Sequence, residues 1–148
     1  LNAGIDRAKP QGAYDLVSLL IGVNNQYRGR DLANYRQEFA ALLQRAIGFA
    51  GGKPARVLVL SIPDWGVTLF AAGRDRAQIA AEIDAFNAVN REETARAGAQ
   101  YVDIAPESRD AASNRALIAA DGLHPSGKIY GEWARLALPA ARKALSEK

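Results

Sequence analysis

Residues 14–22 read YDLVSLLIG, a nearly continuous apolar run that is rich in branched side chains and is bounded by Gly12 and Gly22. This pattern is typical of a strand that helices cover on both faces. Residues 56–62, RVLVLSI, repeat the pattern. Pro63 ends this second run, because proline has no N–H to donate to a sheet. The two runs predict buried parallel strands.

Helical periodicity follows each of these strands. Residues 31–50 and 75–97 place apolar side chains at spacings of three and four. Asp31 is the expected N-cap of the first helix, and Gly51-Gly52 and Gly98 stand where helices stop. The expected core positions are Leu32, Tyr35, Phe39, Leu42, Leu43, Ala46, Ile47, Ile79, Ile83, Phe86 and Val89.

The C-terminal third adds one strand and two helices to the prediction. Residues 101–104, YVDI, are typical of a short strand, and residues 114–120 indicate a short helix that breaks at Asp121-Gly122. A last helix is expected after Pro125, with Ser126 as its N-cap and a kink or an end at Pro139. Its expected inner face carries Ile129, Trp133, Leu136 and Leu145.

Alternating strands and helices predict the fold class α/β, with a three-layer α/β/α parallel sheet and right-handed crossovers. A chain of 148 residues that is 49% apolar is long enough for one domain with its own core. Three strands make a narrow sheet, residues 1–10 are typical of the tail of an earlier helix, and the chain has no methionine. We therefore expect residues 1–148 to form a single domain that is incomplete at its N-terminus.

Composition argues against several classes of partner. The 19 basic and 16 acidic residues are spread along the chain, so the net charge of +3 does not indicate a nucleic-acid surface. One histidine and no cysteine make a metal site unfavourable and exclude a disulfide framework. No apolar run reaches the roughly 18 residues of a bilayer span, and the first residues lack the plan of a signal peptide. No cofactor is expected, and the compartment and the oligomeric state stay open.

Four polar segments follow the predicted strands or precede the last helix. In open parallel sheets, ligands bind beyond the carboxyl ends of the strands. The segments are GVNNQY at 22–27, PDWG at 63–66, APES at 105–108 and DGLHP at 121–125. These are the places to look for chemistry.

His124 is the only histidine, and Asp121 lies three residues before it. An aspartate at this spacing, across a turn that contains glycine, can accept the Nδ1 proton and leave Nε2 as a general base. Pro125 restricts His124 to extended backbone, which would hold the ring at the rim of the loop. The alternative is an ordinary surface or capping pair.

Asn24 follows a predicted strand, and its uncharged carboxamide can donate hydrogen bonds to a developing oxyanion. Alternatively, Asn24 and Asn25 serve only a turn, which asparagine favours. Gly22 either ends the strand or lets a substrate approach the backbone. Trp65, together with Tyr27, either lines an acyl pocket or packs at its rim.

The blocks IGVNN at 21–25 and DGLHP at 121–125 resemble those of the SGNH/GDSL hydrolase family of lipases and esterases. The resemblance implies a flavodoxin-like SGNH fold without its N-terminal strands. It also implies that Asn24 is the oxyanion donor, His124 the base and Asp121 its orienting partner. Gly22, Asn25 and Trp65 would lie along the substrate. The implied activity is hydrolysis of a small-molecule ester or acyl substrate.

The chain departs from the family pattern in one essential respect, because the G-D-S-L block with the nucleophilic serine is absent. Asn25 also stands where the family usually has aspartate. None of the chain's own serines has a nucleophile-elbow setting, since G-x-S-x-G is absent. We expect the serine to lie outside this chain and the chain alone to be inactive. The alternative is a non-catalytic α/β binding domain, or a hydrolase relative without a nucleophile.

Overall fold

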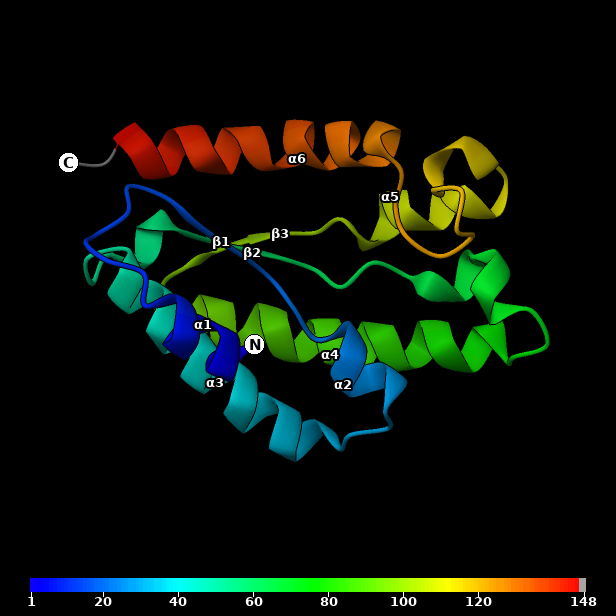
Figure 1. Cartoon of the computed structure of the whole chain (residues 1–148), viewed down its shortest axis with the longest axis horizontal. Coiled ribbons are helices and arrows are strands. Elements are labelled where there is room, and N and C mark those ends of the chain that lie inside the picture. Colours follow the sequence, from blue (N-terminus) through cyan, green and yellow to red (C-terminus); the bar gives the residue numbers. More distant parts are fainter. Residues whose placement is uncertain (147–148) are drawn as a thin grey trace.

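The computed structural model describes residues 1–146 and has three layers (Figure 1). The middle layer is a parallel sheet in the order β1-β2-β3, formed by β1 (Val17–Leu20), β2 (Val57–Leu60) and β3 (Gln100–Val102). Helix α6 (Gly127–Ser146) covers one face, and α3 (Leu32–Phe49) and α4 (Arg76–Ala97) cover the other. The predicted α/β fold class is confirmed.

Short helices connect and extend these layers. The α-helices are α1 (Asn2–Ala8), α2 (Val23–Tyr27) and α5 (Ala105–Arg109). The described part of the chain also has five 3-10 turns, namely η1 (Pro54–Arg56), η2 (Trp65–Val67), η3 (Leu69–Ala71), η4 (Asp110–Ala112) and η5 (Arg115–Leu117). The expected helix over 114–120 is only the turn η5. Helix α5 was not predicted.

The register of the sheet brings all three strand ends to one edge. Val17 pairs with Val57, and Val59 pairs with Tyr101, both in parallel. Because parallel strands run the same way, the segments that follow them meet at the carboxyl edge. Helix α2, turn η2 and helix α5 stand there, one after each strand.

Strand β1 is shorter and less covered than the sequence predicts. The run at 14–22 forms a strand only over Val17–Leu20, and Ser18 and Leu20 are exposed. Helix α6 packs against β2 and β3. Leu19, on the opposite face, belongs to the core under α3 and α4. The expectation of a strand buried on both faces holds for β2 and is wrong for β1.

Helices α3 and α4 begin and end where the sequence predicts. The Asp31 carboxylate accepts a hydrogen bond from the Asn34 N–H, and Asp75 does the same for Gln78. Gly98 ends α4 in the left-handed conformation. The core positions of both helices are buried except Leu32, which is exposed at the first turn of α3.

Helix α6 corrects two expectations. It runs unbroken through Pro139 to Ser146. Proline removes one backbone hydrogen bond, and water can satisfy the freed carbonyl because this part of the helix is exposed. Ile129, Trp133 and Ala144 are buried, whereas Leu136 and Leu145 point to solvent. The inner face between Trp133 and Ala144 is filled by the small side chains of Ala137, Ala140 and Ala141.

A close contact fixes the end of β1. Gly22 has φ 121°, and a Cβ built on it would meet the Tyr35 hydroxyl and lie 2.6 Å from Ile62 Cδ1. Burial raises the pKa of Tyr35 far above its usual range, so this hydroxyl keeps its proton and donates to Asn90 Oδ1 at 2.7 Å. The turn that leads to Asn24 therefore rests on a fixed polar group.

Within residues 1–146, no helix is both long and apolar enough to cross a membrane.

We predict that Gly22→Ala lowers the free energy of unfolding by roughly 2 to 4 kcal/mol, because it adds left-handed strain to overpacking against Tyr35 and Ile62. The measurement is urea unfolding followed by circular dichroism. Gly131→Ala is the matched control, since Gly131 lies inside α6 with nothing within 4 Å of the added Cβ. It should be neutral or stabilising by up to about 1 kcal/mol. Equal effects of the two substitutions would contradict the packing argument.

Candidate active site

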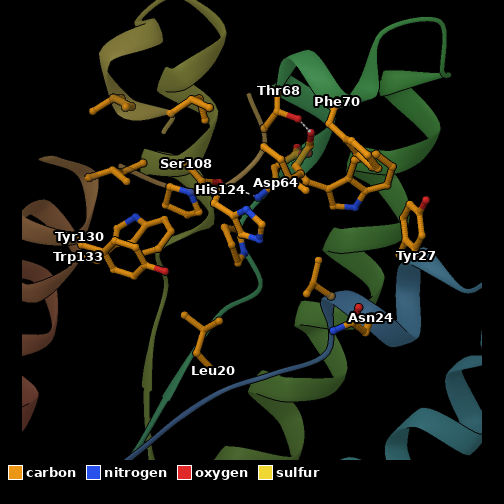
Figure 2. Close-up of a pocket in the computed structure, with 18 residues that line it drawn as sticks. Leu20, Asn24, Tyr27, Asp64, Thr68, Phe70, Ser108, His124, Tyr130 and Trp133 are labelled. Atoms are coloured by element: carbon orange, nitrogen blue, oxygen red, sulfur yellow. Dashed lines mark hydrogen bonds between the residues drawn. The ribbon is translucent and has the colours of Figure 1, made fainter. Parts of the chain in front are cut away.

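A cavity of about 370 Å³ lies at the carboxyl edge of the sheet (Figure 2). Its walls come from α2, the segment after β2, α5, the segment before α6, and α6 itself. Asn24 and His124 both line it. The site residues that the sequence singles out at opposite ends of the chain thus share one cavity.

Asp121 and His124 form a directly bonded pair. His124 Nδ1 lies 2.6 Å from Asp121 Oδ2. The other oxygen, Oδ1, accepts the backbone N–H groups of Leu123 and His124, each at 2.9 Å. The Asp121 carboxylate therefore stabilises the backbone of the turn through one oxygen and binds the His124 ring through the other.

These hydrogen bonds determine the charge and the tautomer of the pair. The backbone N–H groups of Leu123 and His124, followed by the His124 ring, lower the pKa of Asp121 to about 2. Asp121 is then a carboxylate near neutral pH and can only accept. The proton of a neutral His124 must lie on Nδ1, which leaves the Nε2 lone pair free.

The turn is attached to the rest of the fold on both sides. Ile118 and Pro125 form an antiparallel bridge, and the Ala119 N–H donates to the His124 carbonyl at 2.8 Å. Expected as a cap of α6, Ser126 directs its hydroxyl instead to the Ala116 carbonyl at 2.7 Å. The ring is exposed, with 71% of its side-chain surface accessible, so these backbone contacts of the turn and the bond to Asp121 position it.

Asn24 lies in the first turn of α2, directly after the Gly22 turn. Its side chain is exposed and lines the cavity with His124. Figure 2 shows Asn24 on the far side of the cavity from Tyr130 and Trp133. The carboxamide is thus available to an oxygen atom inside the cavity.

Two expected substrate-lining residues lie elsewhere. Asn25 points away from the cavity, where its Nδ2 donates to Glu38 Oε2 at 2.8 Å. Gly22 is buried under Tyr35 and Ile62. A side chain one residue along a helix turns by about 100°, which explains why Asn24 and Asn25 face different ways.

Aromatic side chains form the walls of the cavity. Trp65 lines it and is fixed by a hydrogen bond from its Nε1 to Gln26 Oε1 at 2.8 Å. Tyr27 and Phe70 pack against Trp65, with ring centroids 5.5 and 5.9 Å away. Tyr130 and Trp133 stand on the other side (Figure 2). The walls are therefore mostly apolar around a few polar groups.

The sequence did not predict the ion pair between Asp64, which lines the cavity, and the partly exposed Arg109. Asp64 is almost fully buried; its Oδ2 accepts from Arg109 Nε at 2.9 Å, and its Oδ1 accepts from the Gly66 N–H at 2.8 Å. The Asp64 N–H donates to Ser108 Oγ at 2.8 Å. The hydrogen bond to Asp64 is the main cause that raises the pKa of Arg109, and the hydrogen bond to Asp84 adds to it. The only signal in the sequence is that both segments follow strands.

The hydroxyl groups of five serines donate hydrogen bonds to groups other than His124. Ser108, which lines the cavity, donates to the Ala105 carbonyl at 2.6 Å, and Ser61 donates to Asp103 Oδ1 at 2.9 Å. Ser113, Ser126 and Ser146 donate to backbone carbonyls. Among residues 1–146, no group of three or more His, Cys, Asp or Glu side chains could hold a metal ion.

The sequence of the chain matches a known protein family. Residues 1–131 match the sequence model of the GDSL-like Lipase/Acylhydrolase family. The chain belongs to this family. No curated protein matches the sequence.

Solved structures share the fold at low sequence identity. A mutant of Axe2, an acetyl-xylooligosaccharide esterase from Geobacillus stearothermophilus, is 21% identical over 86% of this chain, with a TM-score of 0.58. LAE5, an α/β hydrolase enzyme from the metagenome of Lake Arreo, Spain, is 21% identical over 99% of it, with a TM-score of 0.62. TesA is 21% identical over 97%, with a TM-score of 0.60.

The match covers only part of each of these structures. This GDSL-like chain spans 59% of the Axe2 chain, 66% of LAE5 and 69% of TesA. The expected SGNH-type α/β fold is therefore confirmed over about two thirds of their length.

We predict that the Asp121 carboxyl titrates near pH 2, measured by NMR of its side-chain carboxyl carbon. A pKa lowered on folding contributes stability above the ordinary value of 3.8, and this contribution is lost as the pH falls toward 2. In His124→Ala the ring contact is absent while the two backbone donors remain, so the midpoint should rise only partly. A midpoint near 3.8 in the unsubstituted chain would contradict the described turn.

Proposed function

We propose that this GDSL-like chain carries the base, its orienting carboxylate and an oxyanion donor of a serine ester hydrolase. The nucleophilic serine would come from outside residues 1–148. The observation that carries the proposal is the 2.6 Å contact between His124 Nδ1 and Asp121 Oδ2, on the rim of a cavity that Asn24 also lines. Family membership supports the reaction class.

The proposed reaction has two halves, and in each half His124 acts first as a base and then as an acid. His124 Nε2 takes the serine proton as the serine oxygen attacks the ester carbonyl, and Asn24 Nδ2 donates to the oxyanion that forms. The tetrahedral intermediate collapses, and His124 returns the proton to the departing alkoxide. Water then repeats the sequence on the acyl-enzyme and releases the carboxylic acid. Asp121 remains a carboxylate throughout and stabilises the imidazolium.

The substrate class follows from the cavity and the family. A small-molecule carboxylic ester fits a cavity of about 370 Å³ with aromatic walls and few polar groups. Axe2 is described as acting on acetyl-xylooligosaccharides, so an acetylated sugar is one candidate ester. No bound cofactor is needed for this chemistry.

The competing proposal is a binding domain without catalysis. It would use the same aromatic cavity, and the Asp121–His124 pair would only shape the loop. The two proposals differ in what happens when His124 is removed, because ligand binding tolerates the loss of an exposed ring while general-base catalysis does not.

We predict that, in the protein that contains this chain and the serine, His124→Ala lowers kcat for p-nitrophenyl acetate by about 10³-fold or more. The ring is exposed, so the unfolding midpoint in urea should change little. The comparison is made on initial rates and unfolding curves of the same preparations. Near-normal turnover in a folded His124→Ala variant would remove the proposed base and favour the binding domain.

We predict that Asn24→Ala lowers kcat by roughly 10² to 10³ with little change in KM, since the hydrogen bond strengthens as the oxyanion forms. Asn25→Ala is the matched control, because Asn25 sits one residue along the same helix and bonds Glu38 outside the cavity. It should keep kcat within a few-fold. A change in KM alone, or equal losses in both variants, would contradict the oxyanion role.

A further inference from the structure

A second cavity of about 350 Å³ lies beside the turn that holds Asp121 and His124 and takes no part in the proposed reaction. Residues 119, 120 and 122 line this cavity alone, residues 123–125 line the cavity that holds His124, and Thr68 and Ile118 line both. The segment 118–125 therefore separates the two cavities. The second cavity is of a size that suits a small molecule.

Two arginines give this cavity its charge. Arg76 and Arg115 both line it, and no aspartate or glutamate among residues 1–146 does. Arg76 Nη2 donates to the Thr68 carbonyl at 3.3 Å, which ties that guanidinium to the cavity wall. Within residues 1–146, neither arginine makes a salt bridge, although six other arginines do. Both arginines are exposed, and their N–H groups other than the one bonded to Thr68 are open to a ligand.

The remaining side chains are mostly apolar and small. They are Val67, Leu69, Ile118, Thr68 and four alanines, Ala111, Ala112, Ala119 and Ala120. The Thr68 hydroxyl already donates to the Trp65 carbonyl at 2.7 Å, so the wall leaves few side-chain partners for the additional oxygens of a phosphate, and its apolar part gains from contact with a hydrocarbon group. Arginine binds a carboxylate in a paired, planar geometry.

We propose that this cavity binds a small apolar carboxylate. Its carboxylate group lies between Arg76 and Arg115, and its hydrocarbon part lies against the alanines. The site is separate from the esterase site, and its occupancy does not depend on catalysis. Its ligand would contact the same turn that holds Asp121, because Gly122 and Ala119 belong to both the turn and the cavity wall.

The test is an NMR titration of the intact protein with sodium hexanoate at low ionic strength. Ala111, Ala112, Ala119 and Ala120 serve as probes that line this cavity alone. We expect saturable shifts at these alanines with a Kd on the order of 1 mM. Arg76→Gln and Arg115→Gln should each weaken binding about tenfold. Arg135→Gln is the control, because Arg135 is an exposed arginine of α6 outside both cavities.

Two further ligands, hexanol and inorganic phosphate, test whether the cavity prefers a carboxylate with a hydrocarbon group. Hexanol should bind at least tenfold more weakly than hexanoate, and inorganic phosphate should not compete with hexanoate at equal concentration. The proposal is overturned if the alanines do not shift, if shifts appear only at Leu123 and Tyr130 in the other cavity, or if hexanol or phosphate binds as well as hexanoate. It is also overturned if the Arg135 variant loses binding as much as the other two.

Discussion

The candidate site depends on the Asp121 carboxylate, which accepts hydrogen bonds from three N–H groups. One oxygen closes the turn through the backbone of Leu123 and His124, and the other binds the His124 ring. The ring is exposed, so little side-chain packing holds it. Without the carboxylate, both the path of the turn and the tautomer of the imidazole would be lost together.

The sheet brings Asn24 to this turn from a hundred residues away. Parallel pairing aligns the carboxyl ends of the strands, and α2 begins where β1 ends. The Tyr35 hydroxyl packs against Gly22 and fixes the turn between β1 and α2. The Asp64–Arg109 pair fixes the neighbouring segment after β2. Buried polar contacts thus determine the shape of the cavity, while the groups proposed for catalysis remain exposed at its rim.

Local signals predicted the parts of the structure that local forces determine. Asp31 and Gly98 cap helices through bonds to residues a few positions away, so their roles could be predicted from sequence. The Asp121–His124 pair spans three residues and was predictable for the same reason. The Asp64–Arg109 pair spans 45 residues and depends on the sheet register, which no periodicity shows. The exposure of Leu136 likewise depends on how α6 is rotated over β2 and β3.

The most direct measurement of the central claim is labelling with a serine-directed fluorophosphonate, followed by peptide mapping. The hydroxyl groups of five serines in this chain donate to other oxygens, so none of these is activated by His124. The account predicts that the protein containing this chain is labelled at a serine outside residues 1–148, and that His124→Ala abolishes the labelling. Labelling at Ser108, or at any other serine of the 148 residues, would contradict it.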